Sequence, residues 1–120
     1  MQNYIPRSGP KQRSKPMQKP PQHFQNLQKN YQPVLDALSR VGQAVREAGP
    51  IQEKDSQLIQ LAASAAIRSE GAVHSHTRRA LEAGASPEEI RQALLLLIST
   101  IGYPTVAAAL SWAEDVLQQH

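Results

Sequence analysis

Two histidines on one predicted helix, and a glutamate just before its start, are the residues best suited to acid–base chemistry in this sequence. They are Glu70, His74 and His76. Imidazole is the side chain whose ordinary pKa lies closest to neutral pH, so a histidine set among apolar side chains can act as a general acid or base. Glu70 lies four residues before His74, where its carboxyl group could orient or protonate that imidazole. These three residues are therefore the candidate catalytic residues.

The two histidines face different sides of the helix, because positions two apart are separated by about 200° around its axis. His76 shares its face with small residues that we expect to pack inward, namely Ala72, Ala80 and Ala83. His74 lies on a more polar stripe with Glu70 and Arg78. One histidine is therefore expected to do the chemistry, and His76 is the first candidate.

Each candidate also has a structural interpretation. His76 could hydrogen-bond a backbone carbonyl and only hold helices together, and Glu70 could favour a helix N-terminus through the helix dipole. A metal site is the weakest interpretation, since His74 and His76 lack i, i+4 spacing and no third ligand is evident. We therefore predict no metal and no cofactor.

The absence of cysteine excludes one class of chemistry for this chain. With Cys 0 in its 120 residues, it can form no disulfide, thiolate metal site or thiol nucleophile. The length suits one folded domain. The hydrophobic fraction is 40% but the aromatic fraction only 4%, so we expect a core of Leu, Ile, Val and Ala. No transmembrane run and no signal peptide are recognisable, which predicts a cytoplasmic protein without membrane contact.

Positive charge is concentrated at the start of the chain. Six of the 13 Lys and Arg residues precede the first acid, Asp36, so the remaining seven face all 10 Asp and Glu, a formal balance of −3. Residues 1–22 are rich in Pro and Gln and are predicted to be a disordered basic tail, followed by one helical domain over 23–120. The segment from Arg7 to Lys29 could touch nucleic acid through charge alone, but we favour a solvated extension because interleaved aromatic residues are lacking.

Apolar periodicity predicts five helices joined by short connections, in an all-α fold. The first restarts at Pro33 after a kink and ends before Gly49. The others are expected at about 53–68, 72–83, 87–101 and 105–118. Ser86 and Glu89 form a capping box at the fourth, which gives the best-defined boundary.

The segment from Leu94 to Ile98 is apolar on every side of the fourth helix. A helix of this kind is normally buried all round. Subunit association would achieve this in a small domain, and burial at the centre of a monomer is the alternative. We predict a homo-oligomer.

Several segments together resemble the carboxymuconolactone decarboxylase superfamily, in particular small members without cysteine. They are Glu53–Ile59, Ser69–Ala80, Gly84–Ile90, Gly102–Pro104 and Ala107–Ala109. The resemblance covers about Val34 to Leu117. It implies a compact array of five to six helices of the alkylhydroperoxidase D-like type, assembled as a dimer, trimer or hexamer with sites near subunit interfaces.

The resemblance also implies two kinds of activity. One is decarboxylation of a carboxylated lactone. The other is peroxidase chemistry by a cysteine pair near a histidine, assisted by a glutamate. Here His76 falls at the histidine of that redox motif, Ser69 and Ala72 at its cysteines, and Gln57 at its glutamate. Since serine and alanine cannot form a disulfide, thiol peroxidase activity is not expected.

The sequence thus favours a non-redox, lyase-like enzyme that acts on a small carboxylated metabolite, with His76 as acid or base. The only arginines near the candidate histidines in the sequence that could bind an anionic substrate are Arg68, Arg78 and Arg79. The alternative is a non-catalytic, oligomeric binding or scaffold module with the same fold.

Overall fold

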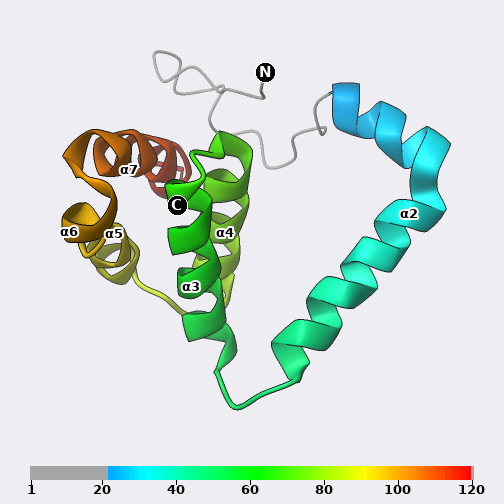
Figure 1. Ribbon diagram of the computed structural model, residues 1–120, viewed down its shortest axis with the longest axis horizontal. Coiled ribbons are helices and arrows are strands. Elements are labelled where there is room, and N and C mark those ends of the chain that lie inside the picture. The colour runs from blue at the N-terminus through cyan, green and yellow to red at the C-terminus, as the bar shows by residue number, and fades with distance from the viewer. Residues whose placement is uncertain (1–21, 120) are drawn as a thin grey trace. The chain divides into compact units, whose positions relative to one another are not determined.

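The computed structural model describes residues 22–119, apart from the side chains at positions 22–24 and 27. Every regular element in this part of the chain is a helix, as predicted (Figure 1). In order they are α2 (Gln22–Glu47), α3 (Glu53–Ala66), α4 (Glu70–Glu82), α5 (Pro87–Leu95), α6 (Ile98–Ile101) and α7 (Tyr103–Leu117). None of these helices is both long and apolar enough to cross a membrane. The predicted basic tail lies outside the described residues, except for Gln22.

The chain divides into two compact units, one ending at Pro50 and the other beginning at Ile51. In the first unit α2 is kinked at Tyr31, whose φ of −134° and ψ of 35° are not helical. Pro33 follows two residues later, in the first turn of the new segment, where its missing N–H breaks no helical hydrogen bond. The predicted restart at Pro33 is confirmed.

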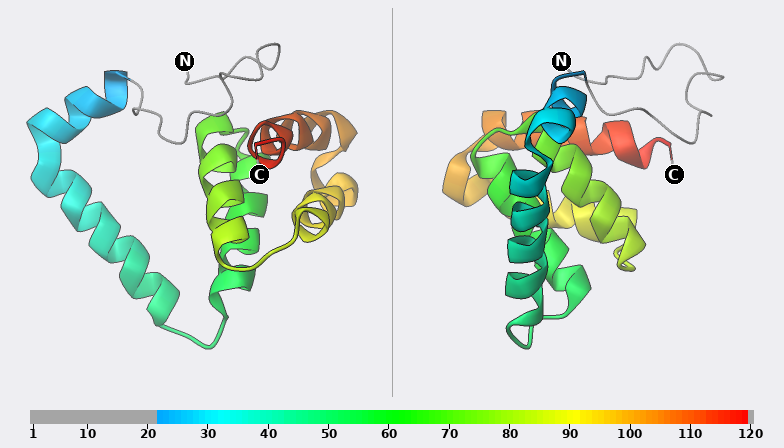
Figure 2. Two further views of the ribbon diagram at one scale, coloured as in Figure 1. Left: turned by 180° about the vertical axis from the view of Figure 1, so that it is seen from behind. Right: turned by 90° about the vertical axis from the view of Figure 1, so that its right-hand side faces the viewer.

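In the second unit α3 and α4 form an antiparallel hairpin, seen from two sides in Figures 1 and 2. The turn between them depends on Arg68, which has a positive φ of 58°. Ser69 then caps α4, because its side chain accepts a hydrogen bond of 3.3 Å from the backbone N–H of Ala72. The predicted break near Ser69 is thus a tight restart of the helix.

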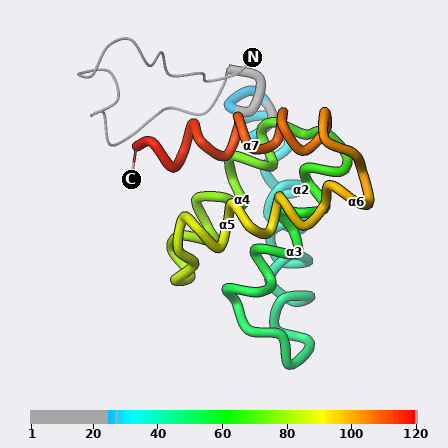
Figure 3. The backbone as a smooth tube through the Cα atoms, turned by 90° about the vertical axis from the view of Figure 1, so that its left-hand side faces the viewer, coloured from blue at the N-terminus to red at the C-terminus, as the bar shows by residue number. Residues whose placement is uncertain are grey.

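The second half of this unit begins with the predicted capping box. The Glu89 N–H donates to Ser86 Oγ at 3.0 Å, and the Ser86 N–H donates to Glu89 Oε1 at 2.9 Å. The fourth predicted helix does not continue to Ile101, however. It ends at Leu95, and the short α6 follows after Leu96 and Leu97 (Figure 3). Gly102, with a positive φ of 89°, then separates α6 from α7.

The core of the second unit lies where α3, α4, α5 and α7 meet. It consists of aliphatic side chains, as the composition predicted: Leu61, Ala65, Val73, Ala80, Ala85, Ile90, Leu94, Ala109, Ala113 and Leu117. Of the apolar run in the fourth predicted helix, only Leu94 is buried. Leu95 is 47% exposed, Leu96 66% and Ile98 39%. The break after α5 therefore turns most of this run outward, which does not support burial within a monomer.

Candidate functional site

Helix α4 contacts α3 and α7 and carries both candidate histidines. Its fully buried stripe is formed by Val73, Thr77 and Ala80. His74 and His76 lie at either side of this stripe and are both partly buried. They bond to different helices, as their separation around the axis predicted.

His76 bonds to α3. Its Nδ1 lies 2.8 Å from Oε1 of Gln57, a residue that is only 1% exposed. The Gln57 amide nitrogen donates in turn to Glu53 Oε2 at 2.7 Å, one helical turn earlier. The result is a hydrogen-bonded chain of carboxylate, amide and imidazole, which we call the Glu53–Gln57–His76 chain.

This chain fixes which atom of His76 carries the proton. A carboxylate oxygen accepts, so the Gln57 amide must turn its NH₂ toward Glu53 and its carbonyl oxygen toward His76. Because that carbonyl can only accept, Nδ1 of His76 must be the donor. Proton exchange at this imidazole is therefore directed to Nε2, as in sites where a second group holds the opposite ring nitrogen.

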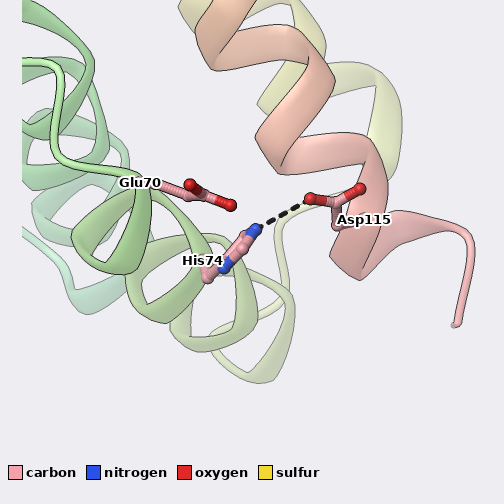
Figure 4. A group of neighbouring side chains, drawn as sticks. All are labelled: Glu70, His74 and Asp115. Carbon is pink, nitrogen blue, oxygen red and sulfur yellow. Dashed lines mark hydrogen bonds and ion pairs between the residues drawn. The ribbon is translucent and has the colours of Figure 1, made fainter. Parts of the chain in front are cut away.

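His74 bonds to α7 instead. Its Nε2 lies 3.0 Å from Asp115 Oδ2, and each of the two side chains is only 16% exposed. Glu70, one turn before His74 on α4, points toward the same place (Figure 4). One ligand atom each from Glu70, His74 and Asp115 lie within 4.8 Å of one another. We call these three residues the Glu70–His74–Asp115 cluster.

Comparison with protein families shows which family this chain belongs to. The family model described as "Carboxymuconolactone decarboxylase family" matches residues 32–115. The chain belongs to the carboxymuconolactone decarboxylase family. Searches of curated proteins and of solved structures found no match. The family match spans the Glu53–Gln57–His76 chain and the Glu70–His74–Asp115 cluster, and it confirms the resemblance recognised in the sequence motifs.

Some of the expected neighbours come together in this family member and others do not. Glu70 and His74 share a site, and His76 meets Gln57. Of the three alanines that were expected to pack inward beside His76, Ala80 is fully buried, and Ala72 and Ala83 are partly buried. The partner of His76 Nδ1 is the side-chain amide of Gln57.

The arginines considered for an anionic substrate have other neighbours. Arg68 donates to Thr105 Oγ1 at 3.0 Å on an exposed part of the surface. Desolvation lowers the pKa of Arg78, and the Glu82 carboxylate opposes this shift. Arginine loses its proton only far above neutral pH, so Arg78 remains a cation.

Sequence reasoning missed two members of these sites. Asp115 is 41 residues from His74 and on another helix, so no local spacing could have indicated it. Glu53 could have been found, since it lies one helical turn before Gln57 on α3. The positions that resemble the redox cysteines are Ser69 and Ala72, and here they form the N-terminal cap of α4.

Proposed function

We propose that this family member is a non-redox, lyase-like enzyme that acts on a small carboxylated metabolite, with His76 as its general acid or base. The observation that carries the proposal is the Glu53–Gln57–His76 chain. A buried amide that holds Nδ1 of a partly buried histidine fixes the ring and its tautomer, which is what a proton-transferring imidazole needs.

The proposed reaction is loss of CO₂ from a carboxylate that lies β to a carbonyl group. The C–C bond to the carboxylate breaks, CO₂ leaves, and the electron pair remains as an enolate. Protonated Nε2 of His76 then donates its proton to the enolate carbon. The Gln57 carbonyl keeps its hydrogen bond from Nδ1 throughout, and the Glu53 carboxylate favours the protonated imidazole electrostatically through the intervening amide.

The test is decarboxylation in D₂O, followed by NMR over a panel of β-keto and lactone carboxylates. The parent protein should release CO₂ and place one deuterium at the carbon that lost it. His76→Ala should lower turnover by about 10²–10⁴-fold, the usual contribution of a general acid or base. Gln57→Leu, which removes the amide at similar volume, should cause a smaller loss and change the pH profile, because the tautomer is no longer fixed.

A matched control is Gln60→Leu, because Gln60 is also on α3 but bonds Ser56 and not His76. It should leave turnover unchanged. Equal turnover in the parent and in His76→Ala would refute the acid–base role. If the folded parent turns over no member of the panel, the scaffold module becomes the better description of this protein.

We also propose that the protein is a homo-oligomer, whether or not it is an enzyme. Leu95, Leu96 and Ile98 form an exposed apolar group at the end of α5 and the start of α6. Clustered apolar exposure of this kind is typical of surfaces that bind another protein.

The apolar stripe of α2 supports the same proposal. Four apolar residues on this helix are spaced four, three and four residues apart, the pattern of a helix that packs along another helix. They are Val34, Leu38, Val41 and Val45, and all are more than half exposed.

Light scattering should give a mass of at least two chains, and Leu96→Glu should reduce it. Ser99→Glu, at a nearby exposed polar position, should not. A parent protein that is monomeric at micromolar concentration would refute the proposal.

A further inference from the structure

The Glu70–His74–Asp115 cluster has no part in the proposed acid–base step at His76. His74 and His76 bond to different helices, so the two sites lie on different sides of α4. The cluster brings one imidazole and two carboxyl groups together from α4 and α7 (Figure 4). We propose that it binds a divalent transition-metal ion, with Zn²⁺ as the best match.

The positions of the ligand atoms suit such an ion. Zinc lies about 2.0–2.2 Å from histidine nitrogen and carboxylate oxygen, so neighbouring ligands of a tetrahedral site are about 3.3–3.6 Å apart. His74 Nε2 and Asp115 Oδ2 are 3.0 Å apart, so they need to separate by only a few tenths of an ångström for zinc to replace the proton between them. No pair in the cluster exceeds 4.8 Å, and a small rotation of the long Glu70 side chain can close the remaining gap.

The charges of the cluster also favour a cation. Two carboxylates meet one imidazole, so the formal charge stays negative even when His74 is protonated. All three residues are partly buried, where the attraction between their carboxylates and a cation is stronger than in water. The Glu70 carboxylate has no hydrogen bond or ion pair with any residue that the structure describes. A favourable interaction with the helix dipole would explain why Glu70 lies at the N-terminus of α4. It would not explain why the Glu70 carboxylate lies close to Asp115.

The types of ligand decide which metal is expected. One imidazole nitrogen and two carboxylate oxygens match the mixed donor sets that bind zinc, whereas Mg²⁺ and Ca²⁺ prefer oxygen ligands alone. Three protein ligands leave the fourth position of a tetrahedral ion for water or a small anion. The inference is thus an open zinc site, independent of the proposed function at His76.

The experiment is titration calorimetry of the full-length protein with ZnCl₂, after metal has been removed with a chelator and dialysed away. At about 100 µM protein, which detects micromolar dissociation constants, we expect one Zn²⁺ per chain. Mg²⁺ at the same concentrations should give no binding. His74→Ala and Asp115→Asn should weaken zinc binding by at least about 100-fold. Loss of a residue that only hydrogen-bonds a metal ligand costs about 10- to 100-fold, and loss of the ligand itself should cost more.

Glu70→Gln is the most informative variant. It leaves the His74–Asp115 bond in place and removes only a carboxylate that is bonded to no described residue. Circular dichroism should be unchanged, while zinc affinity should fall by at least about 100-fold, as for the other two ligands. Glu82→Gln, at an exposed carboxylate on the same helix, is the matched control and should bind zinc like the parent.

Two results would overturn the proposal. One is the absence of zinc binding by the folded parent. The other is zinc binding of equal strength in the parent, His74→Ala and Glu70→Gln, since the ion would then be held by other residues such as His23 or His120. Binding by His76→Ala should be normal, so failure of the acid–base proposal and failure of the metal proposal can be told apart.

Discussion

Thr77 offers the sharpest test of how α4 is packed between its two neighbours. Its side chain is fully buried, yet Oγ1 has no hydrogen-bond partner among the described residues. A buried hydroxyl without a partner costs about 1–3 kcal/mol. Thr77→Val replaces this hydroxyl with a methyl group of nearly the same shape, and valine and threonine have similar helix propensities.

The expected effect follows from these terms. Removing the unpartnered hydroxyl and burying a methyl group, which is worth about 0.8 kcal/mol, should both stabilise the fold. Allowing for imperfect fit, we expect Thr77→Val to raise the free energy of unfolding by about 1 kcal/mol. For a domain of this size, that raises Tm by about 5 °C.

The assay is urea unfolding followed by circular dichroism, together with thermal melting, at one fixed protein concentration because association would shift Tm. Two other threonines serve as matched controls. Thr100→Val, at an exposed position in α6, should change stability by less than about 0.5 kcal/mol. Thr105→Val should not stabilise, because Thr105 Oγ1 accepts a hydrogen bond from Arg68. A loss of stability in Thr77→Val would refute the reasoning, since it would mean that the hydroxyl has a stabilising partner.

Three further changes test the rest of the fold. Ser86→Ala removes the side-chain cap of α5 and should lower the free energy of unfolding by about 1 kcal/mol, measured by urea unfolding. Leu94→Ala should lower it by about 2–5 kcal/mol in the same assay, because Leu94 is fully buried. Two hydrogen bonds lower the pKa of Glu89 from its ordinary 4.5. The larger effect comes from the backbone N–H of Ser86 and the smaller from the side chain of Lys54. The ionised carboxylate therefore stabilises the fold fully above about pH 4.5 and progressively less as the pH falls through the lowered pKa. In melting curves from pH 7 to pH 3, Glu89→Gln should be less stable than the parent at pH 7 and should lose less Tm on acidification.

The parts of the fold that the sequence predicted are those with a local cause. Pro33 and the capping box at Ser86 act through their own backbone groups, and both mark helix starts where expected. Gly84, with a positive φ of 100°, lies where the third predicted helix was to stop. Such signals can be read without knowing what the helices pack against.

The break between α5 and α6 could not be predicted in this way. Leu96 and Leu97 are good helix formers, and no glycine or proline marks the end of α5. Leu97 contacts the core, and the chain must turn there for α7 to pack back onto α5. Tertiary packing therefore overrides a local preference for helix.

In the candidate sites, too, the contacts with a local signal in the sequence could be predicted and those that depend on tertiary packing could not. The resemblance to the redox motif placed Gln57 at its glutamate and His76 at its histidine, and the structure brings these two side chains within hydrogen-bond distance. Helical spacing likewise joined Glu70 and His74. Asp115 required the packing of α7 against α4, a contact between distant segments that no short pattern contains.

The cap at Ser69 has an evolutionary consequence. Ser69 and Ala72 occupy the two positions that resemble a redox cysteine pair, and they are now joined by the hydrogen bond that starts α4. Thiols are weaker hydrogen-bond acceptors than hydroxyls, so cysteines at both positions would weaken this cap and loosen the first turn of the helix that carries Glu70 and His74. Evolution of thiol chemistry by substitution at these positions would therefore begin with a less stable protein, so it would not proceed readily in small steps.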